Sequence, residues 1–136
     1  MSARLVSIRT LPLALLLATA GMLPAAPAQA QLNVAEASLA TAIEDREPRG
    51  VADSFPAEVE QVFLWTRVTG AVEETVVEHV WYFEDEETDR VSLAVGGPSW
   101  RTWSAKTIPA DWTGEWRVEV LGPDDSVLES VSFTVR

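Results

Sequence analysis

The sequence predicts an all-β protein, an immunoglobulin-like antiparallel β-sandwich of about seven strands preceded by a cleaved signal peptide. Three observations support this prediction. From residue 59 onward, apolar and polar residues alternate with a period of two, which is typical of strands with one buried face. Clusters of Gly, Pro and Asp interrupt this alternation as turns do. The 136-residue chain has no cysteine, so packing rather than disulfide bonds must stabilise the fold.

Residues 1–30 have the pattern of a secretory signal peptide, which we expect to be cleaved after Ala30. A positive start, an apolar run and a small-x-small motif follow one another at Arg4 and Arg9, Leu11–Leu23, and Ala28-Gln29-Ala30. The apolar run is shorter than the roughly 20 residues of a membrane-spanning helix, and a lipid anchor would need a cysteine. We therefore expect a periplasmic or secreted protein with no stable membrane anchor, in which residues 31–136 form a single sandwich domain.

The charge balance limits the classes of partner. The chain has 10 basic and 21 acidic residues and a formal charge of −11. Loss of Arg4 and Arg9 with the signal peptide changes this charge from −11 to −13. Such a protein repels phosphate backbones and anionic lipid head groups, so we expect neither nucleic-acid binding nor peripheral membrane binding. Neutral or cationic partners fit better.

The alternation places six strands in the core part of the domain, residues 59–136. They are expected at Gln61–Thr69, Thr75–Phe83, Val91–Val95, Trp100–Ile108, Trp116–Leu121 and Val127–Val135. The acidic run Glu84–Asp89 is expected to be a solvated hairpin loop, because it lacks the Asp/Asn-Gly pattern that bends a calcium-binding loop around its ion. Residues 31–58 hold an N-terminal segment and a polar connection. Within them the alanine-rich Leu32–Ile43 fits a helix and a strand equally well.

Two strands carry unusual motifs, His79-Val80-Trp81-Tyr82-Phe83 and Trp100-Arg101-Thr102-Trp103-Ser104-Ala105-Lys106. Further motifs along the chain are Ile43–Pro48, Trp65–Val68, Gly114–Val118 and Phe133–Val135. Taken in this order, they resemble the bacterial family known as domain of unknown function 2914. The resemblance implies a small β-rich module, often found at the C-terminal end of membrane-associated chains, with no assigned activity. It also favours a strand at Leu32–Ile43, which would be the seventh.

Basic and aromatic side chains gather on these two strands of an otherwise acidic protein. The predicted binding residues are His79, Trp81, Arg101, Trp103, Ser104 and Lys106. His79 is the only histidine and shares a strand face with Trp81, so we expect it to point toward the core or its rim. A catalytic base or metal ligand is the alternative, but the sequence has no second histidine, no cysteine and no Gly-x-Ser-x-Gly elbow.

The strand face that carries Arg101 and Trp103 allows two interpretations. The two side chains lie side by side, and an exposed cation–π ledge there would stack on a sugar ring or grip a peptide. Alternatively, a neighbouring strand or Trp112 covers Trp103, and Arg101 pairs with an acidic residue. On the opposite face, Ser104 and Lys106 are two residues apart and project to the same side, as a catalytic serine–lysine dyad would require. Their Cβ atoms would be about 6–7 Å apart, and the lysine would have to be desolvated to act as a base.

We therefore expect a non-enzymatic binding module of the bacterial cell envelope, with no catalytic residues, metal or cofactor. Its expected partner is an envelope protein or a glycan. One alternative is a carbohydrate-binding module that uses exposed tryptophans. Another is a small hydrolase in which His79 or Lys106 meets a carboxylate and a hydroxyl in a cleft. A third is an accessory domain that packs on a membrane partner through an exposed apolar patch.

Overall fold

A computed structural model describes residues 31–136 together with Gly21, and the rest of the predicted signal peptide lies outside the described residues. The described part has seven strands of eight to ten residues and three shorter strands. The long strands are β1 Asn33–Ala40, β5 Gln61–Thr69, β6 Thr75–Phe83, β7 Glu86–Val95, β8 Ser99–Thr107, β9 Gly114–Leu121 and β10 Val127–Val135. The short elements are β2 Ala42–Glu44, β3 Glu47–Arg49, β4 Ser54–Phe55 and the 3-10 turn η1 Ala57–Val59. Within this part of the chain, no helix is long and apolar enough to cross a membrane.

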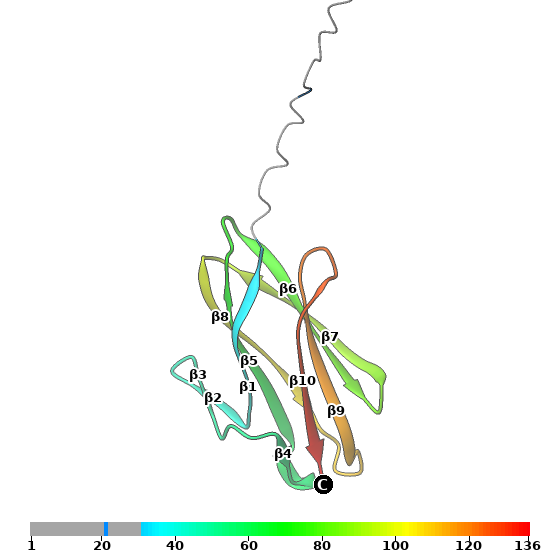
Figure 1. Cartoon of the computed structure of the whole chain (residues 1–136). Coiled ribbons are helices and arrows are strands. Elements are labelled where there is room, and N and C mark those ends of the chain that lie inside the picture. The colour runs from blue at the N-terminus through cyan, green and yellow to red at the C-terminus, as the bar shows by residue number, and fades with distance from the viewer. Residues whose placement is uncertain (1–20, 22–30) are drawn as a thin grey trace, which may run out of the picture.

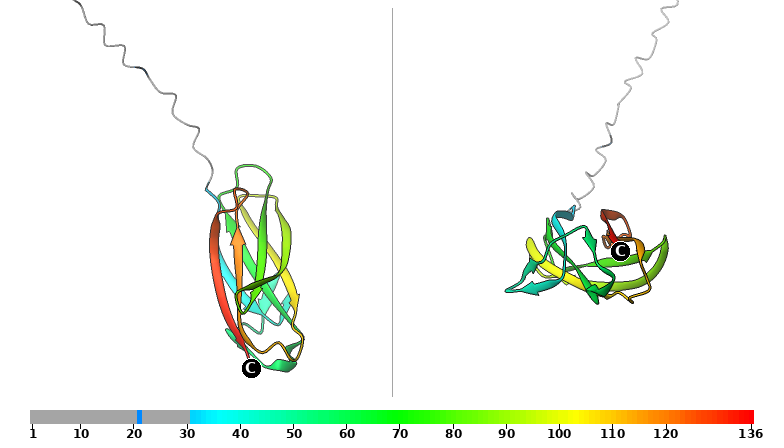
Figure 2. Two further views of the ribbon diagram at one scale, coloured as in Figure 1. Left: turned by 90° about the vertical axis from the view of Figure 1, so that its right-hand side faces the viewer. Right: turned by 90° about the horizontal axis from the view of Figure 1, so that it is seen from below.

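The long strands form two sheets that pack face to face (Figure 1), so the predicted all-β sandwich is confirmed. One sheet has the order β1-β5-β8 and the other the order β4-β10-β9-β6-β7, and β2 and β3 form a separate hairpin. Among the long strands, the fourth (β7) pairs with the third (β6). In immunoglobulin constant domains the fourth strand instead belongs to the sheet of the first and second. Figure 2 shows an elongated body whose C-terminus lies at the end opposite the start of β1.

Three of the predicted strands, at Gln61–Thr69, Thr75–Phe83 and Val127–Val135, have the observed bounds, but the expected acidic loop is wrong. Only Glu84 and Asp85 turn the chain, both with positive φ (48° and 66°), and β7 begins directly after them. The remaining acids belong to β7, which has a neighbour on one side only. An edge strand tolerates charged side chains because one of its sides faces solvent. The acidic composition of residues 84–89 therefore did not distinguish a loop from the start of β7.

The alanine-rich N-terminal segment is a strand rather than a helix. β1 pairs with β5 in antiparallel register from Asn33 to Ala40, with a bulge between Val34 and Glu36. Leu39 and Ala40 are buried, at 3% and 0% exposure. Pairing and burial against β5 outweigh the weak helical preference of alanine. The chain then turns back through the β2–β3 hairpin.

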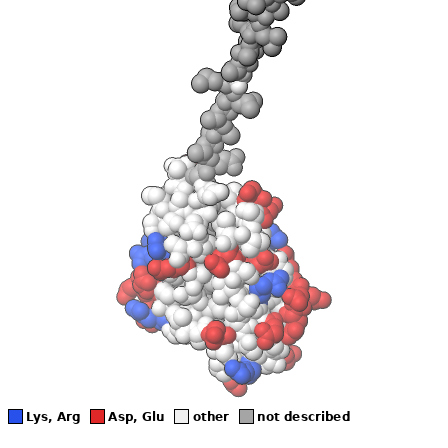
Figure 3. Space-filling view, in the orientation of Figure 1, with Lys and Arg blue, Asp and Glu red and all other residues white. Residues whose placement is uncertain are grey.

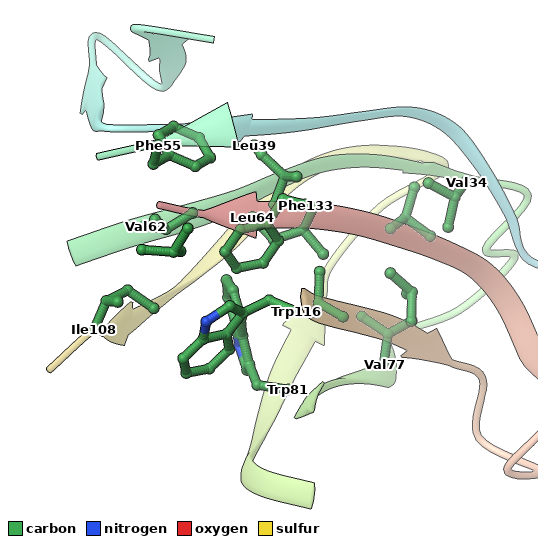
Figure 4. Close-up of a cluster of buried hydrophobic side chains, with 14 of the residues drawn as sticks. Val34, Leu39, Phe55, Val62, Leu64, Val77, Trp81, Ile108, Trp116 and Phe133 are labelled. Atoms are coloured by element: carbon green, nitrogen blue, oxygen red, sulfur yellow. The ribbon is translucent and has the colours of Figure 1, made fainter. Parts of the chain in front are cut away.

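The core lies between the sheets and is centred on aromatic side chains (Figure 4). Trp81 is 0% exposed and Trp116 is 1% exposed. Phe133 lies between them, with ring centroids 6.1 Å from Trp81 and 5.8 Å from Trp116. The rings of Phe83 and Trp112 extend this stack toward the surface, where Trp112 is 37% exposed. One aromatic stack therefore runs from the centre of the sandwich to solvent.

The two ends of this stack give a direct test of where stability resides. We predict that Trp116→Ala lowers the free energy of unfolding by about 3–5 kcal/mol, because it leaves a cavity between two sheets. Trp112→Ala should cost less, roughly 1–3 kcal/mol, since part of its ring is already exposed to solvent. Urea denaturation followed by far-ultraviolet circular dichroism measures both. Equal losses would contradict the assignment of the core.

Candidate functional site

The structure divides the six sequence-predicted binding residues between the interior of the sandwich and the outer face of the β1-β5-β8 sheet. His79, Trp81 and Ser104 lie inside the sandwich. Lys106 also has an inward register position, opposite the buried Val62, but lies at the end of β8 and is half-buried. Arg101 and Trp103 lie on the outer face, and both are half-buried. These six side chains therefore do not form one site.

The inward-facing members form a hydrogen-bonded cluster in the core. Ser104 Oγ lies 2.7 Å from His79 Nδ1 and accepts the indole N–H of Trp81 at 3.1 Å. His79 Nε2 lies 3.5 Å from the hydroxyl of Thr66, which donates to the carbonyl oxygen of Thr102 at 2.9 Å. His79 and Trp81 come from β6 of one sheet, and the other three residues come from β5 and β8 of the other. The cluster therefore joins the two sheets.

The partners of the ring determine which nitrogen of His79 carries the proton. Ser104 Oγ already accepts from Trp81, so its own hydroxyl proton is free to bond His79 Nδ1. Thr66 has given its proton to the carbonyl of Thr102, so its oxygen accepts from His79 Nε2–H. The neutral Nε2–H tautomer thus satisfies every group of the cluster, whereas an imidazolium ring would bring two protons between Nδ1 and Ser104 Oγ.

Burial prevents His79 from acting on a substrate. The side chain is 0% exposed, and desolvation lowers its pKa from 6.5 to about 4. The hydroxyl of Ser104 is engaged by Trp81 and His79, and no hydrogen bond joins it to Lys106 in the described part of the chain. Neither arrangement considered for a hydrolase is therefore assembled in this structure.

On the outer face, the tip of the β2–β3 hairpin contacts β5 and β8. Arg101 forms an ion pair with Glu47, and the indole N–H of Trp65 donates to the carbonyl oxygen of Arg46 at 2.9 Å. The guanidinium of Arg46 lies 5.9 Å from the ring centroid of Trp100. The acid-paired alternative for Arg101 thus matches the structure, and the cation–π contact of this region involves Arg46 instead.

Trp103 is neither fully exposed nor covered by Trp112. Trp103 lies directly opposite Trp65 of the neighbouring strand β5, and Trp65 is 2% exposed beneath the hairpin. Trp112 instead stacks on Phe83 at 5.2 Å in the aromatic stack described above. The expected ledge is therefore reduced to the half-buried ring of Trp103 beside an already paired arginine.

A groove at the end of the sandwich where β1 begins was not anticipated from the sequence. Its volume is about 710 Å³. It is lined by Gln31 and Leu32, by Ala71–Thr75 between β5 and β6, and by Gly122–Asp124, Ser126 and Leu128 around the β9–β10 turn. These two loops correspond to the B–C and F–G loops, which recognise antigen in immunoglobulin variable domains. Sequence analysis missed the groove because its loops are far apart along the chain and meet only through the fold.

The groove combines apolar walls with acids that have no ion-pair partner among residues 31–136. Leu32, Ala71 and Leu128 supply apolar surface, and Val72 is 84% exposed at the rim. The acids are Glu73, Glu74 and Asp124, and no lysine or arginine is among the described lining residues. Hydrogen bonds from the hydroxyl and amide of Ser126 lower the pKa of Asp124, which keeps that carboxylate ionised. Figure 3 shows this end largely free of charge on the viewer's side, with acids gathered beside it.

The described residues contain no group of three or more His, Cys, Asp or Glu side chains that could hold a metal ion. A smaller depression of about 290 Å³ lies near the other end of the sandwich, between Glu84 and Asp85 and residues 115–117. Trp116 contributes to its wall, and the stack with Trp112 lies beside it. Together with the end groove, this depression gives two surface hollows lined by acids.

The buried His79 makes stability depend on pH in a defined window. As pH falls below 6.5 the unfolded chain takes up a proton at His79, while the folded protein resists until about pH 4. We predict a loss of roughly 3 kcal/mol of unfolding free energy from this group across that window. The variant His79→Gln has no imidazole to protonate, so its unfolding free energy should decrease less steeply as the pH falls from 6.5 to about 4. Parallel pH profiles of the two proteins in urea denaturation would rule out the assignment.

Comparison with known proteins provides a family and no activity. A search of the curated proteins finds no match to this chain. Residues 74–135 match the model of a family described as "Protein of unknown function (DUF2914)". The matched segment contains β6 to β10 and with them four of the six motifs that carry the resemblance, whereas Ile43–Pro48 and Trp65–Val68 lie outside it. Over residues 74–135 the chain is therefore similar to the DUF2914 family of proteins of unknown function, the family that its motifs resemble.

Proposed function

We propose that this protein is a non-enzymatic binding module of the bacterial cell envelope that holds a cationic, partly apolar segment of another polypeptide in its end groove. The observation that carries the proposal is the groove itself, whose apolar walls and unneutralised acids lie at the loop end of a rigid sandwich. The signal-peptide pattern of residues 1–30 supports the envelope location.

The size of the groove favours a peptide segment over a flat protein surface. Its volume of about 710 Å³ lies within the range of sites that enclose small ligands. Leu32 and Leu128 offer apolar contact to a side chain inside the groove, and Val72 adds exposed apolar surface at the rim. Burial of an aliphatic side chain between these groups would supply most of the binding free energy.

Charge determines which segment fits. Glu73, Glu74 and Asp124 have no ion-pair partner among the described residues, and the rest of the protein is acidic as well. Such a field accelerates encounter with a cation and disfavours an anion. A segment with a lysine or arginine beside an aliphatic residue therefore fits, because the cation pairs with the acids at the rim and the aliphatic side chain packs against the apolar walls. The loops that carry these groups are held by β5, β6, β9 and β10, so little ordering is needed on binding.

This assignment predicts how peptide affinity depends on charge. A short capped peptide that alternates lysine and leucine should bind, whereas its glutamate–leucine counterpart should not. We predict that Glu73→Lys weakens binding of the lysine peptide roughly threefold to tenfold, since it reverses one rim charge. Isothermal titration calorimetry at low salt measures the effect.

The matched control is Glu58→Lys, which makes the same charge change on an exposed residue of η1, outside the groove lining. It should leave affinity within a factor of about two, because only the distant field changes. Equal weakening by both variants would reduce the interaction to nonspecific charge attraction. Unchanged binding in Val72→Ser and Glu73→Lys together would refute the groove as the site.

Carbohydrate recognition is a second candidate, favoured by one observation at the opposite end. Trp112 is 37% exposed and is held in place by stacking on Phe83, with ring centroids 5.2 Å apart. A tryptophan fixed in this way presents a flat face. The nearby depression is lined by Glu84, Asp85, Glu115 and Arg117, and among the described residues the second oxygen of each carboxylate is left as an acceptor for sugar hydroxyls. Peptidoglycan fragments are the appropriate envelope glycan to test.

We predict that, if this second site is used, titration with peptidoglycan fragments changes the intrinsic tryptophan fluorescence of the wild-type protein. The variant Trp112→Ala should abolish binding while Trp103→Ala leaves it intact, because Trp112 stacks on Trp116 in the wall of the depression, whereas Trp103 lies on the other sheet. Binding to immobilised glycan provides a readout independent of the lost fluorophore. Retained binding in Trp112→Ala would eliminate this candidate.

A further inference from the structure

The four edge strands of the two large sheets differ in how they are protected. The edges are β1 and β8 in one sheet and β4 and β7 in the other. β1 is bulged near its start and followed by the β2–β3 hairpin, and β4 has only two residues. β7 carries three acids, at Glu86, Glu87 and Asp89. Bulges, short length and charge are the usual means by which proteins prevent an edge from pairing with another strand.

β8 has no bulge, is not short and carries no acid, and its charged residues are the two cations Arg101 and Lys106. Its nine residues pair with β5 without a register shift from Ser99 to Thr107. The strand contains no proline and no acid, and β5 is its only hydrogen-bonded neighbour in the described part of the chain. One of its two cations, Arg101, is already paired with Glu47. The outward backbone groups of a long, regular edge are therefore available for another strand.

Electrostatics determine which occupant fits this edge. After loss of the signal peptide each molecule would carry a formal charge of −13, because Arg4 and Arg9 leave a chain of charge −11. Two such molecules repel one another unless they meet where acids are scarce. Contact through β7 would place acids against acids, whereas contact through β8 would place none of the acids of the edge strands in the interface.

We propose that β8 pairs with β8 of a second copy, in antiparallel register about a two-fold axis at Trp103, to form a continuous six-stranded sheet. This register pairs all nine residues of Ser99–Thr107 with the partner strand. It places Trp103 opposite Trp103 of the partner subunit on the outer face. Arg101 faces the partner's Ala105, and Trp100 faces the partner's Lys106. No like charges are opposed, and both aromatic positions gain a favourable neighbour.

The proposal is independent of the end groove and has an opposite dependence on salt. Repulsion between two acidic molecules is screened as ionic strength rises, so the dimer should become tighter from about 0.05 to about 0.5 M salt. Binding of a cationic peptide in the groove should weaken over the same range. Sedimentation velocity across a wide range of protein concentration measures the dimer dissociation constant at each salt concentration.

The variant Trp103→Glu places two carboxylates together at the two-fold axis and should raise the dimer dissociation constant at least about tenfold. The matched control is Ala94→Glu, which adds an acid at an exposed position of the other long edge, β7, and should leave the constant unchanged. Circular dichroism establishes that each variant is folded.

A further measurement needs no variant. Hydrogen exchange of the wild-type protein should show outward amides of β8 becoming protected as concentration rises, while those of β7 stay unchanged. A protein that remains monomeric at every concentration and salt overturns the proposal. Protection on β7 in place of β8, or a dimer that Ala94→Glu weakens as much as Trp103→Glu, also overturns it.

Discussion

The hydroxyl group of Ser104 is the point on which the arrangement of the two sheets depends. It accepts the indole N–H of Trp81 and lies 2.7 Å from His79, so two side chains of one sheet meet one side chain of the other. A slip of either sheet by one residue would leave these polar groups buried without partners, at a cost of about 1–3 kcal/mol each. The apolar residues around them would tolerate such a slip more easily, because dispersion contacts have no direction. The cluster thus selects one packing among several that the core alone would permit.

This use of polar side chains changes where function can reside. His79 and Ser104 would be the natural candidates for catalysis in a chain with one histidine and no cysteine, yet both are committed to joining the sheets. Arg101 is likewise committed to Glu47 of the hairpin. What remains accessible is the loop end, the exposed face of Trp112 and the edge of β8. The proposed recognition roles rest on these accessible features.

The acidic charge of the chain is distributed in a way that supports this division. Arginines on the strands pair with nearby acids, as Arg90 does with Glu78 and Glu87, so the sheet surfaces are partly neutralised. The acids of the end groove have no such partners among the described residues. In the two proposals, a cation binds where such acids meet the apolar walls of the end groove, and two copies approach through β8, which carries no acid.

The sequence by itself determined the fold class, the bounds of β5, β6 and β10, and the family resemblance, because period-two alternation and the two tryptophan motifs are local properties of the chain. It placed Glu84–Asp89 in a loop wrongly, since an edge strand accepts acids as readily as a turn does. Only the tertiary structure decided that Leu32–Ile43 is divided between β1 and β2, that His79 faces a serine from the other sheet, and that Val72 shares a groove with Asp124. Each of these depends on which strands become neighbours, and the pairing of distant segments is fixed by their mutual burial rather than by any local preference.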